Sequence, residues 1–128
     1  MKKLLLLVAL VVVPAGVVTA GEKLSAPVVV NTVARTASGA MGTARNSADG
    51  NQMIGCQVNS GTTFSENVLC SARDAAGNFR SCQSFNATLI QAATAISSNS
   101  QLFFAWDVNN ACTSLSVTTF SRFEPPLP

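Results

Sequence analysis

The sequence predicts a mainly β protein, a small antiparallel β-sandwich or β-roll of roughly six to eight strands with room for one short helix and two disulfides. Three observations carry this prediction. Short runs rich in Val, Thr and Phe alternate with Asn-, Ser- and Gly-rich turn sequences. Long amphipathic stretches with Glu and Lys are missing from the sequence. Four cysteines all lie after residue 20, beyond a basic and then apolar N-terminal segment.

Residues 1–20 have the pattern of a signal peptide. Lys2 and Lys3 form a basic start, residues 4–13 are apolar, and Val18-Thr19-Ala20 supplies small or modest residues before Gly21. The apolar run of about ten residues is shorter than the roughly 20 that cross a bilayer as a helix. We therefore expect cleavage after Ala20, a secreted or periplasmic product, and no membrane span in the mature chain.

The remaining chain is long enough for one domain, which we place at residues 21–124, followed by a Pro-rich tail at 125–128. Cleavage removes Lys2 and Lys3 from eight basic residues, leaving six against six acidic residues. The mature chain is thus formally neutral, and its cations are scattered. Nucleic-acid binding is not predicted, because it requires a clustered basic surface.

The first half of the domain contains two predicted strands. Residues 28–33 form a β-branched run after Pro27, and residues 52–58 alternate so that Ile54, Cys56 and Val58 face inward. Between them, residues 36–43 indicate a turn or a weak strand, and residues 45–51 indicate a loop.

The segment around residues 74–78 predicts a β-hairpin. Asp74 and Asn78 close a three-residue loop, with Gly77 at the left-handed position. Counting outward from this loop predicts the cross-strand pairs Arg73–Phe79, Ala72–Arg80, Ser71–Ser81 and Cys70–Cys82.

The second half predicts a short helix and a second hairpin. Residues 86–96 follow helical spacing with Asn86 as N-cap, although a strand is an alternative for so short a run. Residues 102–108 place Leu102, Phe104 and Trp106 on one face, and residues 112–120 return as the partner strand. A core role for Trp106 is favoured over a sugar-stacking role.

Four cysteines allow three disulfide pairings. The hairpin register favours Cys70–Cys82, which leaves Cys56–Cys112. A zinc site or a redox-active dithiol is not predicted, because the sequence contains no C-x-x-C and no histidine.

The sequence offers little catalytic chemistry, so we predict neither an enzyme nor a cofactor. Without histidine, the chain cannot form Ser-His-Asp or Cys-His arrangements. It also lacks tyrosine, and Lys23 is the single lysine after residue 20. The one sharper hypothesis for a surface site is a small anion-recognition patch formed by Arg73 and Arg80 on adjacent hairpin strands.

These features predict an exported, non-catalytic, disulfide-stabilised protein that acts by binding an unknown protein or glycan. One alternative is a self-assembling cell-surface subunit, in which residues 28–33 add as an edge strand to a neighbouring sheet. Another is a small secreted enzyme inhibitor that presents a loop such as residues 60–66. The sequence predicts neither the partner nor the oligomeric state.

Overall fold

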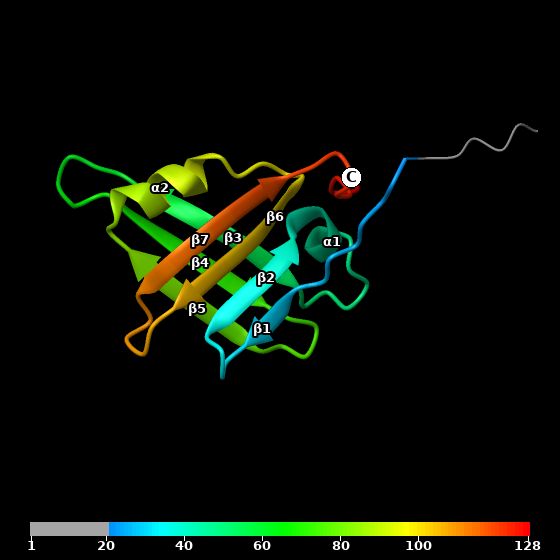
Figure 1. The fold of residues 1–128 in the computed structure, drawn as a ribbon, viewed down its shortest axis with the longest axis horizontal. Coiled ribbons are helices and arrows are strands. Elements are labelled where there is room, and N and C mark those ends of the chain that lie inside the picture. The colour runs from blue at the N-terminus through cyan, green and yellow to red at the C-terminus, as the bar shows by residue number, and fades with distance from the viewer. Residues whose placement is uncertain (1–20) are drawn as a thin grey trace, which may run out of the picture.

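The computed structural model describes residues 21–128, and the predicted signal peptide at residues 1–20 lies outside this part. Two antiparallel sheets and two short helices make up the fold (Figure 1). The four-stranded sheet contains, in spatial order, β1 (Val29–Asn31), β2 (Thr36–Ala40), β6 (Ser100–Trp106) and β7 (Cys112–Thr119). The three-stranded sheet contains β3 (Met53–Asn59), β4 (Asn67–Arg73) and β5 (Phe79–Ser84). The helices are α1 (Met41–Arg45) and α2 (Ala87–Thr94).

The main core lies between the sheets and is built around β6. Leu102, Phe104 and Trp106 are buried on its inner face, as the alternation predicts, while Phe103 is exposed on the outer face. Because β6 pairs with both β2 and β7, it anchors the four-stranded sheet. Val68, Cys70 and Ala72 of the central strand β4 supply the facing inner surface.

The hairpin that joins β4 and β5 has the predicted register, from Arg73–Phe79 to Cys70–Cys82. Asn78 donates from its backbone N–H to Oδ1 of Asp74 and from its side-chain Nδ2 to Oδ2, each at 2.9 Å. The Asn78 side-chain hydrogen bond is the main reason that the pKa of Asp74 lies below its ordinary value. Gly77 has φ +87°, the left-handed conformation expected for this loop.

The predicted helix within residues 86–96 is confirmed as α2. The Asn86 side-chain oxygen accepts hydrogen bonds from the N–H groups of Thr88 and Leu89, at 2.9 and 3.4 Å. These bonds satisfy amide groups that have no partner within the helix itself.

The first half of the domain differs from the expectation in two places. The first strand is only Val29–Asn31, because Oδ1 of Asn31 accepts bonds from the amides of Val33 and Ala34, which turns the chain. After β2, the chain forms α1 instead of extending to residue 43. The small residues Gly42, Thr43 and Ala44 are buried there.

Both disulfides form, but the predicted pairing is wrong. Instead of Cys70–Cys82 and Cys56–Cys112, the bonds are Cys56–Cys70 and Cys82–Cys112. The first bond joins neighbouring strands β3 and β4, and the second joins β5 to β7 of the other sheet.

The register explains this correction, because Cys70 lies opposite both Cys56 and Cys82. The Cα atoms of Cys56 and Cys70 are 4.0 Å apart, which fits the narrow type of antiparallel pair. In an antiparallel sheet, the N–H and C=O groups of one residue point toward the same neighbouring strand. Because Cys70 forms the narrow, non-hydrogen-bonded pair with Cys56, its backbone groups point toward β5. The pair Cys70–Cys82 is therefore the wide, hydrogen-bonded type, with Cα atoms about 5.5 Å apart. Cys82 instead meets Cys112, where the Gln83 N–H donates to the Asn110 carbonyl at 3.1 Å.

Candidate functional site

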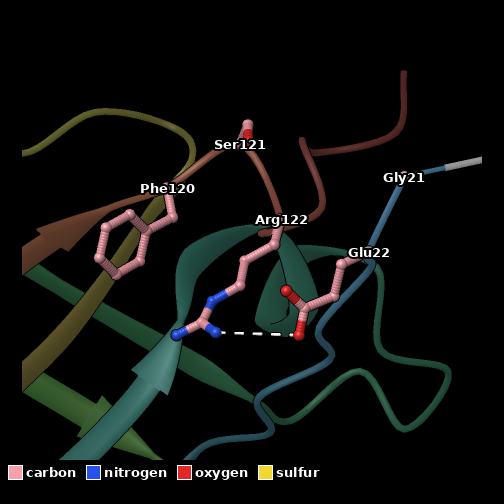
Figure 2. Close-up of a pocket in the computed structure, with 5 residues that line it drawn as sticks. All are labelled: Gly21, Glu22, Phe120, Ser121 and Arg122. Atoms are coloured by element: carbon pink, nitrogen blue, oxygen red, sulfur yellow. Dashed lines mark ion pairs between the residues drawn. The ribbon is translucent and has the colours of Figure 1, made fainter.

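The two ends of the domain meet beside an open depression of about 530 Å³ (Figure 2). The Leu24 N–H donates to the carbonyl of Arg122 at 2.8 Å, and Leu24 forms an isolated parallel bridge with Phe123. The depression is lined by Gly21, Glu22, Phe120, Ser121 and Arg122. A second depression of about 500 Å³ shares Ser121 and Arg122 and extends to Leu127.

Arg122 is the main polar group of this junction. Its guanidinium carbon lies 5.0 Å from the ring centroid of Phe120 and 5.6 Å from that of Phe123, within cation–π range. Its Nη1 lies 3.8 Å from Oε1 of Glu22, and both side chains are exposed. Figure 2 shows the two side chains reaching toward each other across the floor of the depression.

The C-terminal segment that follows is held against α1. Asn46 donates from Nδ2 to the carbonyl of Pro125 at 3.1 Å, and its Oδ1 accepts from the Leu127 N–H at 2.7 Å. A Cβ at Gly42 would lie 1.6 Å from the carbonyl oxygen of Glu124, so only glycine permits this approach. Figure 1 shows the C-terminus coiled beside α1.

These contacts identify the depression beside Arg122 as the place where the N- and C-terminal segments of the domain meet. The guanidinium is already stacked on two rings and paired with a carboxylate. Phe123, only 2% exposed, packs beneath it. Within residues 21–128, no group of three or more His, Cys, Asp or Glu side chains is arranged to hold a metal ion. The Leu24–Arg122 backbone hydrogen bond and the packing of Phe123 hold the two ends of the domain together at this junction.

Arg73 and Arg80, the predicted anion patch, project from opposite faces of their hairpin. Arg73 pairs with Phe79 and lies 5.5 Å from its ring centroid, whereas Arg80 pairs with Ala72. Paired residues share a face and successive residues alternate, so this register separates the two guanidiniums. Nη1 of Arg80 donates to the carbonyl of Phe79 at 2.8 Å. The predicted register already implied this separation, because it pairs neither arginine with the other.

The loop at residues 60–66, named as a candidate inhibitory loop, is exposed along its whole length. Phe64 is its prominent feature, with 53% of the residue exposed. A Cβ at Gly61 would lie 2.5 Å from the Phe64 ring, so the ring packs directly over the glycine. Sequence reasoning did not single out Phe64, although a lone aromatic residue between polar neighbours is a visible signal.

The base of this loop is held by a hydrogen bond and a disulfide. Nδ2 of Asn59 donates to Oδ1 of Asn67 at 3.1 Å, joining the ends of β3 and β4. Three register positions farther along the same strands, the Cys56–Cys70 bond joins them covalently. The loop therefore presents Phe64 from a braced hairpin.

Comparisons of the chain with protein-family models, curated proteins and solved structures found no match. In the part of the chain that the structure describes, no helix combines the length and apolarity needed to cross a membrane.

We predict that packing of Phe123, more than the charge of Arg122, holds the two ends of the domain together. Phe123→Ala should lower the free energy of unfolding by about 3–5 kcal/mol, because it empties a buried aromatic site. Arg122→Met keeps the apolar stem and should cost less than about 1 kcal/mol, because exposed ion pairs contribute little. Urea unfolding of the two variants measures both values, and a larger cost for Arg122→Met would contradict this account.

Proposed function

We propose that this chain is an exported, non-catalytic, disulfide-stabilised protein that acts by binding a protein or glycan through its surface. The observation that carries the proposal is the pairing of all four cysteines, one bond within a sheet and the other between sheets. Disulfides form and persist mainly in the oxidising compartments that exported proteins reach.

The N-terminal pattern supports the same compartment. Its basic start, short apolar run and small residues before Gly21 are what signal peptidases and export machinery read. The domain that follows is small, and two crosslinks supply stability that a core of this size provides only in part. In this proposal, export brings the chain to a compartment where its stabilising disulfides can form.

The Phe64 loop supports a role in binding. Aromatic residues, Phe among them, bury large areas on contact and are enriched in the cores of protein interfaces. The Gly61 contact and the Cys56–Cys70 bond limit the motion of this loop before a partner binds. An exposed aromatic side chain on such a loop fits a concave apolar pocket on the partner.

Export is tested by expressing the full chain in a bacterium with an intact secretion system. We expect a periplasmic or extracellular product that begins at Gly21 and whose mass shows two disulfides. Ala20→Arg should block cleavage, because position −1 requires a small residue. A matched version without residues 2–20 should stay in the cytosol with reduced thiols. An unprocessed full-length chain in the cytosol would contradict the proposal.

The exposed loop that carries Phe64 also favours a second function, inhibition of a secreted hydrolase. Proteases with an apolar specificity pocket accept an aromatic side chain on an exposed loop. In this function, Phe64 would enter the pocket, and the braced hairpin would hold the loop in place after binding.

Inhibition is tested by titrating the mature protein against chymotrypsin, which has such an apolar pocket. We expect stoichiometric inhibition that weakens at least about tenfold in Phe64→Ala, since losing one well-packed aromatic contact costs 2 kcal/mol or more. Phe120→Ala is the matched control, because Phe120 has the same 53% exposure as Phe64 but lies at the terminal junction. Equal inhibition by the two variants, or rapid cleavage of the loop, would exclude this function.

A further inference from the structure

Three of the four cysteines lie in one row across the three-stranded sheet. Cys56 of β3 is directly opposite Cys70 of β4, and Cys70 is directly opposite Cys82 of β5. The outer members of the row belong to different disulfides, Cys56–Cys70 and Cys82–Cys112. The two bonds are therefore adjacent, with Cys70 and Cys82 as facing neighbours.

The distances allow exchange between these bonds along the row. Cys70 and Cys82 form the wide type of pair, with Cα atoms about 5.5 Å apart, which lies within the roughly 4.4–6.8 Å that a disulfide spans between Cα atoms. Cys56 and Cys82 are two strand spacings apart, roughly 9–10 Å, which is too far for a bond. Cys70 is therefore the member that can pair with either neighbour.

The four cysteine residues also differ in exposure. Cys70 is fully buried, and Cys82 and Cys112 are almost fully buried. Cys56 is only partly buried, and its strand β3 lies at the edge of the sheet. An external thiol therefore reaches the row first at Cys56.

We propose that Cys56 is a thiol-modification site whose reaction moves the second disulfide. A small-molecule thiol, as its thiolate, attacks Sγ of Cys56 and forms a mixed disulfide, while the Cys56–Cys70 bond breaks and Cys70 leaves as a thiolate. The Cys70 thiolate then attacks Sγ of Cys82. The Cys70–Cys82 bond forms, the Cys82–Cys112 bond breaks, and Cys112 leaves as a thiolate that takes a proton from water.

This exchange consumes one thiol and keeps the number of disulfides at two, so no oxidant is required. Its consequence is structural. The bond between the two sheets is replaced by one within the three-stranded sheet, which frees β7 from its covalent link to β5. The reaction is reversible, because the released Cys112 thiolate can attack Cys82 again. The three cysteines of the row therefore make the covalent link between the sheets sensitive to external thiols.

The test compares two variants of the oxidised mature protein, in each of which one cysteine is replaced by alanine. Cys56→Ala leaves Cys70 as a free thiol opposite Cys82, whereas Cys70→Ala leaves Cys56 two strands away from Cys82. After incubation at mildly alkaline pH, thiols are trapped with N-ethylmaleimide in acidic denaturant and located by peptide mass spectrometry. We expect labelled Cys112 to be at least about tenfold more abundant in Cys56→Ala, because only that variant can exchange.

Label confined to Cys70 in Cys56→Ala, or equal labelling of Cys112 in both variants, would overturn the proposal. The wild-type protein provides a second measurement that does not depend on folding of the variants. With one equivalent of reduced glutathione, we expect glutathione on Cys56, a Cys70–Cys82 linkage and a free Cys112 thiol. Glutathione on Cys112, or a retained Cys82–Cys112 bond beside a free Cys70, would equally overturn it.

Discussion

The Cys82–Cys112 bond is the covalent constraint on which the arrangement of the two sheets depends. It joins Cα atoms 5.0 Å apart at the point where β5 and the start of β7 come together. The inner face of β6 then packs against the inner face of β4, which buries Leu102 and Phe104 completely. A crosslink that closes a loop with a sequence separation of 30 contributes about 3.6 kcal/mol by restricting the unfolded chain, a large share of the stability of a small domain.

Local features of the fold could be predicted from the sequence because they depend on neighbouring residues. The loop from Asp74 to Asn78 sets the register of its own hairpin, and Asn86 caps the helix that begins next to it. The alternation along β6 reveals its buried face for the same reason. α1 escaped prediction because it has only five residues, and because its Gly42 lies against the Glu124 carbonyl, far along the chain.

The disulfide pairing could not be predicted from one hairpin, because Cys70 has an opposing cysteine on both sides. To choose between Cys56 and Cys82 as the disulfide partner of Cys70, one must know which of the two cross-strand pairs is narrow. One must also know where Cys112 lies in the other sheet. The same limitation applies to the candidate sites. Adjacency of the two strands predicts an arginine patch, but the register places Arg73 and Arg80 on opposite faces of the hairpin. The role proposed for Phe64 rests on its contact with Gly61 and on the bracing of its loop, which only the structure shows.

The two disulfides connect the stability of the fold with the proposed binding loop and the proposed thiol exchange. Cys56–Cys70 braces the hairpin that presents Phe64, and Cys82–Cys112 fastens the sheets. The central claim is therefore this connectivity, and peptide mass spectrometry of the purified, non-reduced protein tests it most directly. The account predicts linked peptides containing Cys56 with Cys70 and Cys82 with Cys112. Peptides linking Cys70 with Cys82 and Cys56 with Cys112 in the untreated protein would contradict it.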